Sequence, residues 1–432
     1  MEQTIGPARK LTGEVLVPGE LEPAEKNLVL ATLASGESHV QNVPPTIEPL
    51  MVVLKTLGAE IRRQKNDLIV QGKGLRGFQA HEKRVDLNPL HQDTALMLIA
   101  LLAGQPFASQ FKPGRHRDAV EALLQLLAPM GIGLERPDED TISVGGKEDL
   151  QGVEHGPLDL SLGHKLALLI TGLYAEGVTR FLEALKSRHR VAYYLRQRQV
   201  AVERTRQENG EHYLVSVEGS QVLEPLTVEI PGQLSLAYPF IVAALSLKGS
   251  ALKLRRLMVR SENRAFLDMV RQLGAPIELE EAGDGTTDLM VRAGAVKSTR
   301  IAGQRSEKVV EHIALLAVLA TQAAGQFVIR DIDHLRRGDY DFVAHLVELL
   351  RQRGAKVGEF PEGLVVDGGL PLSGGLIDAK GDLGLVQAFA VVGLLAEEEM
   401  TIQGAECLDD VYPNFFAALE AVKETRKSRA RG

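Results

Sequence analysis

The chain has 432 residues, which is enough for two or three domains and for large buried cores. Its 49 Lys and Arg against 57 Asp and Glu give a net charge of −8. This acidic balance argues against nucleic-acid binding, which needs a basic face. A single cysteine excludes a disulfide framework and a thiolate metal site. We see no signal core and no apolar run long enough to span a bilayer, so we expect a cytoplasmic protein without membrane contact.

The first predicted element is an extended run, GEVLVPG (13–19), which ends in a Pro-Gly turn and leads into a helix-like segment. Such a helix start presents free backbone N–H groups to an anion. Here, however, the turn carries Glu20, Glu22 and Glu25, and only Lys26 supplies a positive charge. The carboxylates make this helix start a poor site for a negative ligand.

Six segments further along the chain share one pattern: an Ala/Leu-rich helix, a small or acidic break, and a short β-branched run. They occupy 26–43, 94–111, 164–184, 235–257, 312–332 and 385–405, and their breaks lie 68 to 76 residues apart. Second helices and hairpin-like pairs follow in most of them. Each repeat is therefore predicted to be β-α-β-α-β-β, and the unit is too long for a solenoid.

The repeats divide into two predicted lobes of three. A second extended run, TVEIPG (227–232), precedes the fourth repeat as GEVLVPG precedes the first. We therefore predict crossovers near 17–20 and 230–233, with one lobe at 20–230 and the other at 1–19 plus 231–432. The first helix of each repeat is apolar nearly all round, so it should be buried. The three buried helices of each lobe should begin at the lobe interface, where their partial charges favour anions.

Several segments resemble the enolpyruvyl transferases, in particular the 5-enolpyruvylshikimate-3-phosphate synthase family. They are GEVLVPG, LAGQPF, LITGLYAEG, IDAKGD, FAVVGLLAEE and GAECLDDVYPNFF, in the family's order over nearly the whole chain. The resemblance implies a two-lobed inside-out α/β barrel of six repeats. It also implies transfer of an enolpyruvyl group from phosphoenolpyruvate to shikimate-3-phosphate, with phosphate release and with neither a metal nor a cofactor.

The resemblance also assigns site residues, and here the chain departs from the family pattern. Lys and Arg of the family motifs are replaced by Leu21, Leu96 and Gly384, among others. Glu311 stands at the position of the catalytic acid. The remaining candidates are substrate-binding residues: Lys26, Ser161, Lys165, Ser187, Arg188, Arg336 and Asp382.

These replacements predict a degenerate homologue that binds a small anionic metabolite or a protein partner. A charge-assisted hydrogen bond contributes about 1.5–3 kcal/mol, so losing about five would cost roughly 8–15 kcal/mol of substrate affinity. The alternatives are an active transferase that uses shifted residues or a different acceptor, and a purely structural subunit. The remaining cations could serve a smaller anion or, as we favour, pair with nearby acids.

Overall fold

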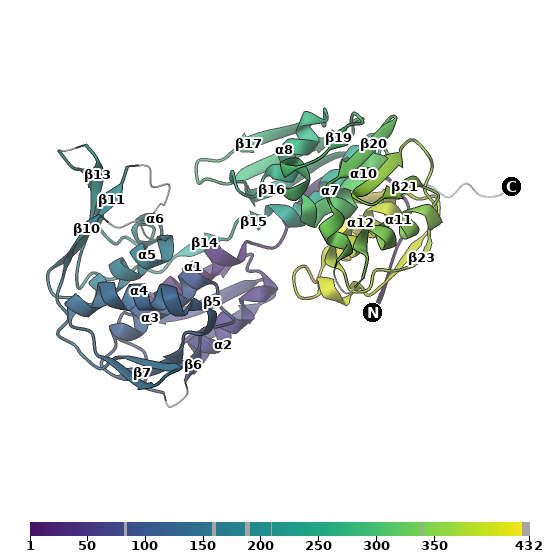
Figure 1. Cartoon of the computed structure of the whole chain (residues 1–432). Coiled ribbons are helices and arrows are strands. Elements are labelled where there is room, and N and C mark those ends of the chain that lie inside the picture. The colour runs from purple at the N-terminus through teal and green to yellow at the C-terminus, as the bar shows by residue number, and fades with distance from the viewer. Residues whose placement is uncertain (82–83, 158–160, 186–190, 209, 338–339, 426–432) are drawn as a thin grey trace. The chain divides into compact units, whose positions relative to one another are not determined.

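The computed structural model describes the whole chain except residues 82–83, 158–160, 186–190, 209, 338–339 and 426–432 (Figure 1). The chain forms two compact units. We call Glu20–Ile230 the inserted unit, and Met1–Gly19 together with Pro231–Gly432 the terminal unit. Each unit has its own hydrophobic core.

The inserted unit contains three four-stranded sheets of one design. Each sheet has a parallel pair of strands followed by an antiparallel hairpin, in the orders β14-β3-β5-β4, β6-β7-β9-β8 and β10-β11-β13-β12. The helices are α1 (Leu21–Leu33), α2 (Glu48–Thr56), α3 (Gln92–Ala103), α4 (Arg117–Leu127), α5 (Leu162–Gly172) and α6 (Tyr193–Arg196). The strands are β3 (Ser35–Gln41), β4 (Glu60–Gln64), β5 (Asp67–Lys73), β6 (Val85–Asp86), β7 (Ala108–Lys112), β8 (Leu134–Asp138), β9 (Thr141–Gly145), β10 (Glu154–Pro157), β11 (Val178–Ala184), β12 (Val202–Arg206), β13 (His212–Glu218) and β14 (Thr227–Glu229).

The terminal unit has one sheet of the same design, β19-β20-β22-β21, and two that depart from it: the six-stranded β17-β18-β16-β2-β25 with β15 beside β16, and the three-stranded β1-β24-β23. Its helices are α7 (Leu234–Ser246), α8 (Ala265–Gln272), α9 (Gln304–Glu307), α10 (Ile313–Thr321), α11 (Phe342–Gln352), α12 (Leu383–Leu395) and α13 (Phe415–Val422). Its strands are β1 (Glu2–Ile5), β2 (Ala8–Val15), β15 (Gly232–Gln233), β16 (Ala251–Met258), β17 (Ile277–Glu281), β18 (Thr287–Arg292), β19 (Arg300–Ile301), β20 (Gln326–Arg330), β21 (Lys356–Phe360), β22 (Gly363–Asp367), β23 (Gly375–Asp378), β24 (Met400–Gln403) and β25 (Lys423–Thr425).

The predicted β-α-β-α-β-β succession is continuous in the second to fifth repeats, as far as the described residues show it. The outer two repeats borrow strands from elsewhere in the chain. The first uses β14 as the parallel partner of β3, and the sixth uses β1 as the antiparallel partner of β24. The N-terminal segment thus completes sheets of the terminal unit, since β2 also pairs with β16.

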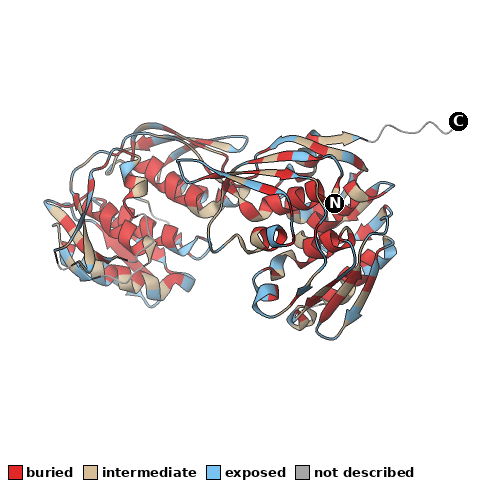
Figure 2. Cartoon of the chain, turned by 90° about the horizontal axis from the view of Figure 1, so that it is seen from above, coloured by how far each residue is buried: buried red, intermediate tan, exposed pale blue. Residues whose placement is uncertain are grey.

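The first helix of each repeat is buried along nearly its whole length, with exposed or half-buried residues only at its ends, as its apolar sequence predicts. In α3 every residue from Ala95 to Ala103 is fully buried, and α10 and α12 are almost as enclosed. Figure 2 shows these helices in red inside each unit. Small polar residues such as Thr32, Thr171 and Thr321 lie near the C-terminal ends of these helices. The candidate site residues on α1, α5 and α12 lie instead at the N-cap or in the N-terminal half.

Candidate functional site

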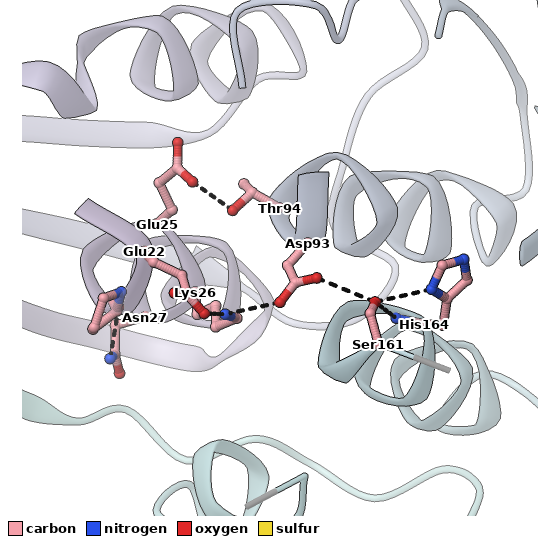
Figure 3. A network of polar contacts seen from close by, with 9 residues as sticks. Glu22, Glu25, Lys26, Asn27, Asp93, Thr94, Ser161 and His164 are labelled. Atoms are coloured by element: carbon pink, nitrogen blue, oxygen red, sulfur yellow. Dashed lines mark hydrogen bonds and ion pairs between the residues drawn. The ribbon is translucent and has the colours of Figure 1, made fainter. Parts of the chain in front are cut away.

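In the inserted unit, the starts of α1, α3 and α5 meet in a polar network (Figure 3). Its centre is Lys26, whose side chain is 0% exposed. The Lys26 ammonium donates to a carboxylate oxygen of Glu22, one turn earlier in α1, and lies 3.2 Å from Oδ2 of Asp93 at the start of α3. The only cation of the first helix start is therefore held between two carboxylates.

Asp93 also contacts the start of α5. Its Oδ1 accepts a hydrogen bond of 3.3 Å from the hydroxyl of Ser161, the N-cap residue of that helix. A Cβ atom at Gly163 would lie only 2.3 Å from the same oxygen, so the glycine permits this close approach. The carboxylate of Asp93 thus occupies the start of α5, where backbone N–H groups favour an anion.

His164 supports Ser161 from the other side. Its Nδ1 lies 2.9 Å from the Ser161 hydroxyl oxygen, and its Nε2 lies 2.8 Å from the carbonyl oxygen of Ala119. A carbonyl only accepts hydrogen bonds, so Nε2 carries a proton. With a neutral imidazole Nδ1 can only accept, so the single hydroxyl proton of Ser161 points to either His164 Nδ1 or Asp93 Oδ1, and the hydroxyl lies between the two.

A second carboxylate, Glu25, is buried beside this network at 2% exposure. Thr94 donates a hydrogen bond of 2.6 Å to its Oε2. Burial raises the pKa of Glu25, because the charged form loses its hydration, and the Thr94 hydroxyl only partly offsets this.

Lys165 follows Ser161 by one helical turn and is also paired. Its ammonium lies 3.3 Å from Oε1 of Glu183 on β11, and both side chains are buried. Arg204 on β12 approaches the other oxygen of Glu183 at 3.2 Å. Lys165 is therefore engaged by a structural ion pair.

The terminal unit contains a cavity of about 660 Å³ at the starts of its three buried helices. The lining includes the candidates Glu311 and Asp382, and also Gln233, Ser235, Leu236, Val310, His312, His334, Leu335, Tyr340, Phe342, Leu383, Gly384, Gln387 and Val411. None of these described residues is a lysine or an arginine. The structure thus brings Glu311 and Asp382 together in one cavity.

Asp382 caps α12 and positions a tyrosine. Its Oδ1 accepts the backbone N–H of Leu385 at 2.9 Å, and its Oδ2 lies 3.3 Å from the hydroxyl of Tyr340. Burial, reinforced by the charge of Asp382, raises the pKa of Tyr340 to about 12, so the phenol remains a hydrogen-bond donor.

His312 is packed against aromatic rings on the wall of the same cavity. Its ring meets those of Tyr238 and Phe266 edge-on, at centroid distances of 4.7 and 5.5 Å. Burial lowers the pKa of His312 to about 4, so its imidazole is neutral at physiological pH.

Arg336 lies on the neighbouring 3₁₀ turn Asp333–Arg336 but does not line the cavity. Its guanidinium lies 2.7 Å from Asp341 and 3.3 Å from Glu359. Ser187 and Arg188 fall outside the described residues. The structure therefore groups Lys26 with Ser161, and Glu311 with Asp382, whereas Lys165 and Arg336 are held by acids.

The sequence-based candidates did not include several residues of these sites, among them Asp93, His164, His312, Tyr340 and Gln387. His164 and Gln387 lie on the buried helices α5 and α12, where the apolar pattern identifies the helix but not the direction of each polar side chain. The only available signal was that polar residues interrupt otherwise apolar helices.

No helix in the described part of the chain has both the length and the apolar character needed to cross a bilayer. No cluster of three or more His, Cys, Asp or Glu side chains there has an arrangement that could hold a metal ion.

Known proteins resemble this chain over nearly its full length. The family described as EPSP synthase (3-phosphoshikimate 1-carboxyvinyltransferase) matches residues 5–419. A 3-phosphoshikimate 1-carboxyvinyltransferase of Brevibacillus brevis is 30% identical over 96% of this chain and 99% of its own length. One from a Sulfurihydrogenibium species is 28% identical over 98% and 100%.

Solved structures agree on the fold. An EPSP synthase from Acinetobacter baumannii superposes with a TM-score of 0.72 at 21% identity, covering 99% of this chain and 100% of its own. The enolpyruvyl transferase NikO from Streptomyces tendae gives 0.60 at 16% identity, covering 97% and 96%. The predicted two-lobed inside-out α/β fold is confirmed, and the chain belongs to the EPSP synthase family.

Proposed function

We propose that this family member does not transfer an enolpyruvyl group from phosphoenolpyruvate to shikimate-3-phosphate, and that it acts as a binding homologue. The observation that carries the proposal is the position of Lys26, enclosed between the carboxylates of Glu22 and Asp93. To reach the Lys26 ammonium, a substrate phosphate or carboxylate would have to displace the side chain of Glu22 or Asp93. These side chains are tethered beside Lys26 by the fold, so they compete at a high local concentration.

The surroundings of Lys26 strengthen this argument. Asp93 occupies the start of α5 and also holds Ser161, so the groups that would receive an anion are satisfied internally. Lys165 and Arg336 are paired with acids, and no lysine or arginine lines the described cavity around Glu311. Near the cavity, Lys380 lies 5.1 Å from the centroid of the Tyr340 ring. Apart from this lysine and the helix starts, the cations described here are held by acids, so two substrates with two phosphates and two carboxylates would meet few free cations.

The active-transferase alternative is favoured by a different observation, the match of curated 3-phosphoshikimate 1-carboxyvinyltransferases over nearly the whole chain. In that case Glu311 would act as the general acid and base, and Ser161 and Asp382 would contact substrate. This reading requires Lys26 to leave Asp93 when substrate binds.

A measurement of phosphate release distinguishes the binding homologue from the active transferase. The full chain is incubated with shikimate-3-phosphate and phosphoenolpyruvate, and inorganic phosphate is measured against a curated 3-phosphoshikimate 1-carboxyvinyltransferase as positive control. We expect no release above the reaction without protein. Turnover near 1 per second, a rate ordinary for enzymes, would establish the active alternative.

A further inference from the structure

Lys380 differs from the other cations near the candidate sites. Lys26, Lys165 and Arg336 are each held by carboxylates, whereas Lys380 forms no ion pair with a residue in the described part of the chain. Its ammonium lies 5.1 Å from the centroid of the Tyr340 ring, and that tyrosine lines the cavity of the terminal unit. An aromatic ring attracts a cation more weakly than a carboxylate does. Lys380 therefore brings an available positive charge beside this cavity.

The backbone turn before α12 holds Lys380 in an unusual conformation. Its φ is +51°, in the left-handed region that residues with a side chain rarely adopt. Its backbone N–H donates a hydrogen bond of 2.8 Å to Oδ1 of Asp378 at the end of β23. Gly404 packs closely on the same turn, since a Cβ atom there would lie 2.6 Å from the nitrogen of Gly381. Residues in sparsely populated conformations cluster at functional sites, so this turn indicates a role for Lys380.

A cation of the family pattern is missing from the same part of the cavity. Gly384 stands where the family has a cation, and it lines the cavity at the start of α12. No lysine or arginine is among the described residues that line the cavity. Lys380 lies in the turn that leads into the same helix. A shifted cation is therefore available where the family's own cation has been lost.

The cavity suits a ligand with one negative charge and an apolar body. Glu311 and Asp382 contribute two negative charges, which Lys380 and the starts of α7, α10 and α12, roughly +0.5 each, together offset. A ligand with several charges would exceed this positive charge. Leu335 and Phe342 belong to the apolar wall, and the volume of about 660 Å³ is within the range of roughly 300–1,000 Å³ typical of small-molecule sites.

We propose that Lys380 selects the ligand of this cavity, a small organic anion with a single carboxylate on an aromatic or apolar body. The ligand carboxylate lies toward the Lys380 ammonium and the start of α12. The apolar body contacts Leu335 and Phe342, and the Glu311 carboxylate accepts a hydrogen bond from a polar hydrogen of the ligand. The inference rests on the proposed function, because it names the ligand class that the binding homologue takes.

The test compares indole-3-propionate with its neutral amide, indole-3-propionamide, which has nearly the same shape. The chain contains no tryptophan, so the indole emission of the probe reports binding to the full-length protein without indole background. We expect the propionate to bind about tenfold more tightly, since only the carboxylate forms a charge-assisted hydrogen bond with Lys380. Equal affinity, tighter binding of the amide, or no binding of either probe at millimolar concentration would overturn the proposal.

Variants of Lys380 separate a binding role from a structural one. Lys380→Gln should weaken the propionate about fivefold and leave the affinity for the amide unchanged, because the loss of a charge affects only the charged probe. Lys380→Arg keeps the charge and should keep the preference for the propionate. An equal loss of affinity for both probes in Lys380→Gln would mean that Lys380 acts only on the structure, and the assignment would be wrong.

Lys297→Gln is the matched control. Lys297 is an exposed lysine of the same unit, and it pairs with Ala324 beyond the C-terminal end of α10, whereas the cavity lies at the start of that helix. Its replacement should leave the affinity for both probes at the parent level. If Lys297→Gln weakens the propionate as much as Lys380→Gln does, the preference follows the overall charge and the assigned role of Lys380 is wrong.

The phosphate-release assay keeps this inference distinguishable from the proposed function. No release together with a Lys380-dependent preference for the propionate supports both. No release together with equal affinities rejects only the role of Lys380. Release together with the Lys380-dependent preference rejects only the proposed function.

Discussion

The ammonium of Lys26 lies 3.2 Å from the carboxylate of Asp93, and the lysine side chain is fully buried. The contact joins the starts of α1 and α3, and its two residues are 67 positions apart in sequence. A buried charge needs such a partner, because its removal from water is otherwise very costly. Lys26 and Asp93 therefore form a structural element as well as a candidate ligand site.

Removing one partner of this pair should destabilise the inserted unit. We expect Lys26→Met to lower the free energy of unfolding by about 3 kcal/mol, because Asp93 is left without its cation. Asp93→Asn should also destabilise the protein, and the double variant should cost less than the sum of the two. Denaturant unfolding of all four proteins measures the coupling. Additive effects would mean that the pair contributes no interaction energy.

Removing both carboxylates from Lys26 should recover an anion site. In Glu22→Ser with Asp93→Asn the ammonium and the helix starts remain, so local charge rises by two. We expect phosphoenolpyruvate to bind at least about tenfold more tightly than to the parent, as measured by calorimetry.

The control for this experiment is Asp118→Asn, which removes an exposed carboxylate from the first turn of α4 in the same unit. It should leave affinity at the parent level. If the parent already binds phosphoenolpyruvate as tightly as the double variant, the Glu22 and Asp93 carboxylates do not block the site, and the active alternative gains support.

Restoring the family pattern at the first helix start gives a second route to the same site. Leu21→Lys, Glu22→Ser and Lys26→Arg together raise the charge by two, since the last change is neutral. We expect weak phosphoenolpyruvate binding above the parent and no phosphate release, because Leu96 and Gly384 still stand where the family has cations. Catalysis by this triple variant would show that the first helix start alone limits activity.

Glu25 should make stability decrease as pH rises. Its pKa is raised by burial above the ordinary 4.5, so the folded chain holds this proton at a pH where the unfolded chain has released it. Stability should therefore fall with increasing pH from about 4.5 up to the raised pKa. Glu25→Gln removes this dependence, and we expect a higher melting temperature at neutral pH. A lower melting temperature at neutral pH would mean that the charged form of Glu25 is stabilised in the folded protein.

His312 should make the stability of the folded protein decrease as pH falls into the acid range. Its pKa falls from 6.5 to about 4 on burial, so the unfolded chain binds a proton in this range that the folded chain excludes. The contribution of the neutral imidazole to the free energy of unfolding is fully present above pH 6.5. It is lost as pH falls toward 4, and a pKa shift of this size corresponds to about 3 kcal/mol. His312→Phe keeps the contacts with Tyr238 and Phe266, and should flatten the unfolding free energy between these pH values. An unchanged acid profile would contradict the buried, neutral state of His312.

The sequence by itself determined the architecture of this protein. Six apolar helix patterns at near-regular spacing specified six buried helices, and the resemblance of segments such as GEVLVPG and IDAKGD indicated the family. This information is local, because a helix that is apolar all round has to be buried whichever neighbours cover it. Replacement of the family cations at Leu21, Leu96 and Gly384 could also be seen in the chain alone.

Only the tertiary structure decided which charges meet. Lys26 pairs with Asp93, and Lys165 with Glu183, because the folding of separate repeats brings their helix starts and strands together. Likewise, Gln387 is the single polar residue in the apolar sequence of α12, and only the packed structure shows that it lines the cavity at the starts of α7, α10 and α12. Side-chain direction and partner choice depend on distances between segments far apart in the chain, and these distances follow from core packing rather than from residue spacing.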